Sequence, residues 1–175
     1  MSGTEPTRPP AAHPRVQFVH GLEGSPQGAK ARLFAANFET RTPAMDTADF
    51  DACISVHANV LRDFAPDLLV GSSFGGAVAV ELLRIGAWRG PTLLLAQAAV
   101  RRDPGARLPA AVPVWLVHGR DDALIDVADS RALASTGDPK WVRLFEVDDD
   151  HALHATVRDG RLLGIVRELL ESAAR

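Results

Sequence analysis

The chain has 175 residues, a length that suits one domain with a substantial hydrophobic core. Its composition is that of an ordinary globular protein, with 46% hydrophobic and 23% charged residues. A formal net charge of -3 gives no electrostatic reason to expect nucleic acid as a partner. The single cysteine, Cys53, allows no internal disulfide and no thiolate-rich metal site, so we expect a protein of the reducing cytoplasm.

The first 14 residues differ in composition from the rest of the chain. They contain four prolines among polar residues and lack the apolar core of a signal peptide. We therefore expect a disordered lead-in over residues 1–14 and a single domain over residues 15–175. No apolar run approaches the roughly 20 residues that a membrane span requires, so no membrane span is expected.

From residue 15 onward, short β-prone runs alternate with segments of helical periodicity. Strands are predicted at residues 15–19, 68–70, 91–96, 114–117 and 142–147, with a strand stub at 41–43. Helices are predicted at 29–38, 50–64, from the turn after residue 70 to residue 85, at 126–135 and around 162–170. Residues 97–113 form a loop with room for one helical turn. This alternation predicts a three-layer, doubly wound α/β sandwich around a mostly parallel sheet of six strands.

One turn between a strand and a helix carries a chemical signature. Residues 71–75 read Gly-Ser-Ser-Phe-Gly, which places Ser73 at the centre of Gly-x-Ser-x-Gly, the nucleophile elbow. Ser72 fails the same spacing because Val70 and Phe74 stand two residues to either side of it. The alternative is a turn of small residues in which Ser73 only caps the following helix.

Other polar residues also follow strands, and ligands of such sheets bind beyond the carboxyl ends of the strands. His20 and Gly21 follow the first strand, Asp121 and Asp122 follow the strand at 114–117, and His151 follows the last strand. The sheet should therefore bring a serine, a carboxylate and a histidine to one edge, in the chain order Ser, Asp, His.

This order resembles that of the α/β-hydrolase superfamily. The likeness extends from Val16 to near the end of the chain and includes the His20-Gly21 dipeptide, the serine elbow, Gly-x-x-Asp-x-x-Ile at 119–125 and an Asp-His pair at 150–151. The sequence looks most like small, cap-less bacterial serine esterases, in which a His-Gly loop with Ser25-Pro26 leads into a helix with Lys30-Ala31. The resemblance implies a minimal α/β-hydrolase fold without a cap, because residues 97–113 are too few for one.

The resemblance also implies roles for particular residues. Ser73 would be the nucleophile, and Asp122, three residues after Gly119, would be the acid; Asp121 is then a turn residue and Asp126 a helix N-cap. His151 would be the base, with His154 a supporting or solvated residue. The backbone N–H groups of Leu22 and Phe74 would form the oxyanion hole.

The predicted function is hydrolysis of a small-molecule acyl ester or thioester through an acyl-enzyme, without a cofactor or metal. His20, Arg101 and Arg102 are candidate substrate-binding residues. The loop that replaces a cap carries Arg101, Arg102 and Arg107, whose guanidinium groups could favour an anionic substrate. Solvated arginines are the alternative for that loop. His57 and Cys53 are expected in the core, and His118 in a structural hydrogen bond.

Three other functions remain open at this point. A catalytically idle α/β-hydrolase scaffold would bind small molecules only, although every triad position holds a competent residue. A nucleotide-binding protein would use the glycines at 71–76, but the Gly-x-Gly-x-x-Gly spacing and a phosphate-binding lysine are missing. His151 and His154 have the spacing of two metal ligands, but no partner cluster with ligand spacing accompanies them.

Overall fold

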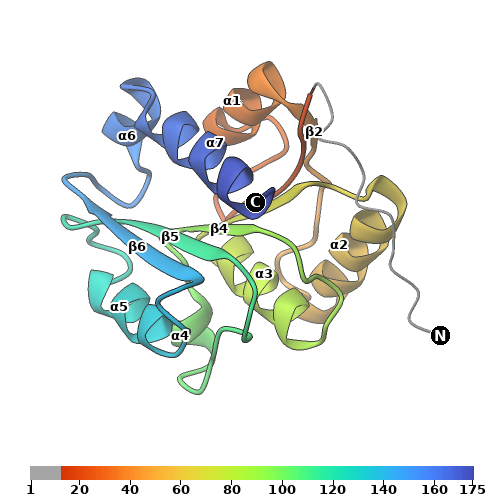
Figure 1. The fold of residues 1–175 in the computed structure, drawn as a ribbon. Helices are drawn as coiled ribbons and strands as arrows, with labels where there is room; N and C mark the ends of the chain where they lie inside the picture. Colours follow the sequence, from red (N-terminus) through yellow and green to blue (C-terminus); the bar gives the residue numbers. More distant parts are fainter. Residues whose placement is uncertain (1–12) are drawn as a thin grey trace.

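The computed structural model describes residues 13–175, so the predicted lead-in lies outside the described residues except for its last two positions. Six parallel strands form one sheet in the order β2-β1-β3-β4-β5-β6 (Figure 1). The strands are β1 (Arg15–Val19), β2 (Glu39–Arg41), β3 (Leu68–Ser72), β4 (Thr92–Leu95), β5 (Val114–Gly119) and β6 (Val142–Val147). The helices are α1 (Ala29–Asn37), α2 (Phe50–Phe64), α3 (Phe74–Arg84), α4 (Ala99–Arg102), α5 (Val127–Ser135), α6 (His154–Arg158) and α7 (Arg161–Ala173).

Helices cover both faces of the sheet, which confirms the predicted three-layer α/β sandwich. Successive side chains of a strand point to opposite faces, so Leu68 and Val70 pack with α1 and α7, whereas Leu69 packs with α2 and α3. Figure 1 shows α1 and α7 on one side of the sheet and α2 to α5 on the other. The central strands β3, β4 and β5 are buried throughout, as their continuous apolar runs require.

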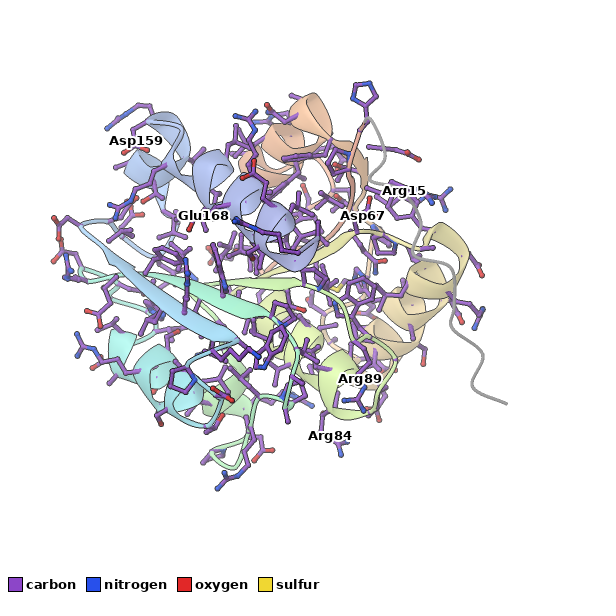
Figure 2. The ribbon with its side chains drawn as sticks, in the orientation of Figure 1. Arg15, Asp67, Arg84, Arg89, Asp159 and Glu168 are labelled. Atoms are coloured by element: carbon purple, nitrogen blue, oxygen red, sulfur yellow. The ribbon has the colours of Figure 1, made fainter. Side chains whose placement is uncertain are left out.

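Two hydrogen bonds join β1 and β3 at their amino ends. The backbone N–H of Arg15 donates to the Asp67 carboxylate at 2.8 Å, and the N–H of Asp67 donates to the Arg15 carbonyl at 2.7 Å. Figure 2 shows these two labelled residues near one another at the start of β1 and β3. The pairing that follows places Val19 opposite Gly71, so β1 and β3 end together at the edge where the candidate site lies.

Two details of the chain differ from the sequence-based expectation, and a third agrees with it. The strand stub lies at Glu39–Arg41 rather than at 41–43, because β2 pairs from Arg15 onward and Pro43 has no N–H to donate. The loop at 97–113 contains one helical turn, α4, in agreement with the expectation. The short helix α6 was not expected; it follows Leu153, whose φ of 58° is left-handed.

Among the described residues, 13–175, no cap domain covers the carboxyl edge of the sheet. Between β4 and β5, where a cap would be inserted, the chain contributes only α4 and loop. The minimal form of the fold is therefore the one observed. Within residues 13–175, no helix is both long and apolar enough to cross a membrane.

Candidate active site

Ser73 occupies a strained turn between β3 and α3. Its φ of 55° and ψ of -116° are values that a residue with a side chain rarely adopts. The turn is held by four backbone hydrogen bonds of 2.8–3.4 Å: the Ser73 N–H donates to Leu95, and the Ser73 carbonyl accepts from Gly76, Ala77 and Ala98. The main chain therefore fixes the direction of the serine hydroxyl.

The two glycines of the motif are required by close backbone contacts. A Cβ atom on Gly75 would lie 2.1 Å from the Val19 carbonyl oxygen of β1, and one on Gly71 would lie 2.4 Å from the Gly75 carbonyl oxygen. Neither backbone atom can move away without moving its strand or helix. The first turn of α3 thus packs directly on the sheet, and Ser73 stands at the carboxyl end of β3.

The sheet brings Ser73, His151 and Asp122 together. The Nε2 atom of His151 lies 3.0 Å from the Ser73 hydroxyl oxygen, and its Nδ1 atom lies 2.7 Å from Oδ2 of Asp122. Because a carboxylate only accepts, Nδ1 carries the proton and Nε2 is free to accept the serine proton. The geometry is that of a nucleophile, a base and a residue that orients the base.

The carboxylate of Asp122 is fully buried and held at both oxygens. Its Oδ1 accepts the backbone N–H groups of Leu124 and Ile125 at 2.9 and 2.8 Å. Burial alone would raise the pKa of Asp122, but these hydrogen bonds and the one from His151 outweigh it and lower the pKa below its ordinary value. Asp122 is therefore ionised at neutral pH.

A second, buried histidine also contacts Asp122. The Nε2 atom of His118 lies 3.1 Å from Oδ2 of Asp122 and 2.9 Å from the Ile125 carbonyl, two acceptors that assign the His118 proton to Nε2. Its Nδ1 atom then accepts from the Ser130 hydroxyl at 2.7 Å, and Ser130 in turn accepts from Gln97. His118 is thus in the expected structural hydrogen bonds, and sequence reasoning missed their connection to Asp122.

Two backbone N–H groups near Ser73 have no acceptor. Within residues 13–175, neither Phe74 nor Leu22 donates a backbone hydrogen bond. The Gly21 carbonyl accepts from Gly24 and from Nδ1 of His20, at 3.0 and 2.9 Å. Since a trans peptide directs its C=O and N–H to opposite sides, these bonds hold the Leu22 N–H away from the His20 ring.

An apolar cavity of about 570 Å³ opens beside the triad, a volume typical of small-molecule sites. Its walls include Ser73 and His151, together with His20, Lys30, Arg101 and Leu22. Most of the remaining lining side chains are apolar, among them Phe18, Ala31, Phe74, Ile125 and Val157. His20 lines the cavity but is only 5% exposed, so its bond to Gly21 suits it to shaping the loop.

The structure separates the arginines of the 97–113 loop. Arg101 lines the cavity and forms an exposed ion pair with Asp129 at 3.3 Å. The Arg102 guanidinium instead lies 3.5 Å above the Phe50 ring, and neither Arg102 nor Arg107 lines the cavity. The expectation that Arg102 faces the substrate is therefore wrong: stacking on an aromatic ring holds its side chain elsewhere.

The other polar residues near the site have partners of their own. His154 is exposed, and its Nδ1 atom lies 3.0 Å from the Asp150 carboxylate. Asp126 caps α5 by accepting the Ala128 N–H, as predicted. No cluster of three or more His, Cys, Asp or Glu side chains in the described part of the chain could hold a metal ion.

Comparison with solved structures identifies the fold. A candidate hydrolase of the alpha/beta superfamily from Xanthomonas campestris is 24% identical, with a TM-score of 0.72 over 92% of this chain and 97% of that one. The mouse alpha/beta hydrolase domain-containing protein 10 is 15% identical, with a TM-score of 0.74 over 91% and 90%. An esterase from Rhodococcus is 17% identical, with a TM-score of 0.68 over 93% and 92%.

No protein-family model and no curated protein matches the sequence. At these sequence identities, the structural similarity establishes the fold only. The chemistry has to be inferred from the residues of the site.

Proposed function

We propose that this chain, which has the α/β-hydrolase fold, is a serine hydrolase that cleaves carboxylic esters or thioesters of small molecules. The observation that carries the proposal is the connected row of hydrogen bonds from Ser73 through His151 to Asp122, at 3.0 and 2.7 Å. Ser73 and His151 line a cavity that is large enough for a small acyl substrate. A chain with a single cysteine needs no disulfide, which is compatible with a protein of the reducing cytoplasm.

The proposed first step is acylation. The Ser73 hydroxyl oxygen attacks the acyl carbonyl carbon while Nε2 of His151 takes its proton. The carbonyl oxygen becomes negatively charged, and the unused N–H groups of Phe74 and Leu22 are the donors that would stabilise it. Asp122 stays ionised and stabilises the His151 imidazolium.

The intermediate then collapses. His151 returns its proton to the leaving alcohol or thiol, and the acyl group remains bonded to Ser73. Water enters the cavity and attacks the acyl carbonyl carbon while His151 takes one of its protons. The bond between the acyl group and the Ser73 oxygen then breaks, His151 returns the proton to that oxygen, and the carboxylic acid leaves. Each step uses groups of this chain, so the reaction needs no cofactor.

The test is labelling of the serine together with turnover. A fluorophosphonate probe should label the wild-type protein and Ser72→Ala but not Ser73→Ala. Hydrolysis of 4-nitrophenyl butanoate should fall by several powers of ten in Ser73→Ala. Normal turnover by Ser73→Ala would refute the proposal, and a wild-type protein that neither labels nor turns over would favour the idle scaffold.

A further inference from the structure

Lys30 lies on the wall of the same cavity as the triad. It belongs to α1, and the cavity lining between α1 and α6 also includes Phe18, Ala31 and Val157, which are apolar. Figure 1 shows α1, α6 and α7 on one side of the sheet. A lysine at such a position loses much of the water that would otherwise solvate its charge.

The ammonium group of Lys30 has no ion-pair or hydrogen-bond partner within residues 13–175. No carboxylate oxygen lies within 4.0 Å of it, and it donates to no protein acceptor. Burial lowers the pKa of Lys30, and attraction from Asp150 and Asp149 only partly offsets that effect. The charge is therefore half-buried and uncompensated by contact.

The two attracting carboxylates are already occupied by other donors. Asp149 accepts from both the backbone N–H and the hydroxyl of Thr156, each at 2.7 Å. Asp150 is bonded to His154. Neither carboxylate forms an ion pair or a hydrogen bond with Lys30, and each is held in place by its own donors.

The remaining charged groups of the cavity wall do not replace that partner. Arg101 is a cation with its own carboxylate, Asp129. Glu23 is the carboxylate that lines the cavity; it is exposed, in the turn that carries Leu22. Lys30 thus stands as an unpaired cation in an otherwise mainly apolar lining.

We propose that Lys30 binds a carboxylate carried by the substrate, so that the preferred substrates are esters or thioesters with a second, anionic carboxylate. An ammonium group gives three donors to such a group, and the apolar walls accept the hydrocarbon between the carboxylate and the scissile bond. This inference rests on the proposed hydrolase function and names its substrate class. It assigns anion recognition to Lys30 on α1.

The experiment uses matched substrates that differ only in charge. The 4-nitrophenyl half-ester of glutaric acid is compared with the corresponding ester of glutaramic acid, which tests a carboxylate on the acyl side. The butanoyl ester of 4-hydroxybenzoate is compared with that of 4-hydroxybenzamide, which tests a carboxylate on the leaving group. The readout for each pair is the ratio of kcat/KM for the anionic substrate to that for the neutral one.

The variants remove or retain the positive charge. Lys30→Met and the smaller Lys30→Gln remove it, Lys30→Arg retains it, and Arg32→Met removes an exposed cation of the same helix outside the cavity. In one substrate pair, the wild-type ratio should exceed the Lys30→Met ratio about tenfold, as expected for a charge-assisted hydrogen bond. Arg32→Met should keep the wild-type ratio, and Lys30→Arg should keep most of it.

The outcomes separate this inference from the function on which it rests. In one outcome, the wild-type protein labels at Ser73 and hydrolyses the neutral esters, but its kcat/KM ratios equal those of Lys30→Met and Lys30→Gln. That outcome overturns the role of Lys30 and leaves the hydrolase function standing. Protein that neither labels nor hydrolyses any of the four esters overturns both. A ratio lost equally in Arg32→Met also refutes the inference, because it reflects overall charge.

Discussion

Lowering the pH from 7.5 to 5.5 should destabilise the protein through one buried histidine, His57. The Gln17 amide group donates to both Nδ1 and the carbonyl oxygen of His57, so the proton of the ring is on Nε2, where no partner lies within residues 13–175. Burial, with a smaller contribution from His20, lowers the pKa of His57 from 6.5 to about 4. A charged ring would find no acceptor there.

The size of the effect follows from linkage. In this pH range the unfolded chain binds a proton at His57 and the native protein does not, so the free energy of unfolding decreases as the pH falls. With pKa values of 6.5 unfolded and about 4 folded, the decrease between pH 7.5 and 5.5 is about 1.3 kcal/mol. Carboxylates contribute little there, because their ordinary pKa values lie near 4.

The assay is urea unfolding at both pH values, followed by the fluorescence of the three tryptophans. His57→Gln removes the titrating ring, and the pH-dependent loss of stability should be smaller by about 1.3 kcal/mol than in the wild type. His13→Gln removes an exposed histidine and should keep the wild-type loss. If His57→Gln loses as much stability as the wild type, the burial argument for His57 is refuted.

Three further predictions concern the site and its frame. Asp122→Asn should lower kcat at least about 100-fold, because the amide cannot hold His151 in the same tautomer, whereas Asp121→Asn should have little effect; equal losses would mean that the proposed acid is wrongly assigned. Gly75→Ala should give misfolded or inactive protein, because the added Cβ would meet a backbone carbonyl of β1. Gly164→Ala is the control: open space surrounds this helical position, so the free energy of unfolding should rise by about 0.5–1 kcal/mol in the same urea assay. His118→Leu should lower kcat for a neutral ester about tenfold at constant KM, because His118 contacts Asp122 and not the cavity; a changed KM with normal kcat would contradict this.

The sequence predicted the elements whose signals are local. Each central strand is a continuous apolar run between turn residues, and α2 and α7 have apolar side chains at helical spacing, so all of these elements were located correctly. Helix α6 has five residues and starts after a left-handed Leu153, which leaves it too short for any periodicity. The β2 stub was displaced because its register depends on pairing with β1.

The candidate triad was predictable because each member lies within four residues of the end of a strand, and parallel strands end at a common edge. Contacts between residues distant in the sequence were not. The Arg102 side chain was expected over the pocket, yet it stacks on Phe50, a residue 52 positions away in the chain. Likewise, nothing local to Lys30 indicates that its ammonium group would lack a carboxylate partner.

The glycines of the serine turn have a consequence for how this sequence can diverge. Gly71 and Gly75 allow backbone atoms of β1, β3 and α3 to contact one another directly, so the position of Ser73 depends on backbone contacts and not on particular side chains. Exchanging one hydrophobic residue for another in the surrounding core changes the free energy of unfolding but does not alter these backbone contacts directly. Most core positions can therefore vary while the serine stays in place, and the two glycines cannot.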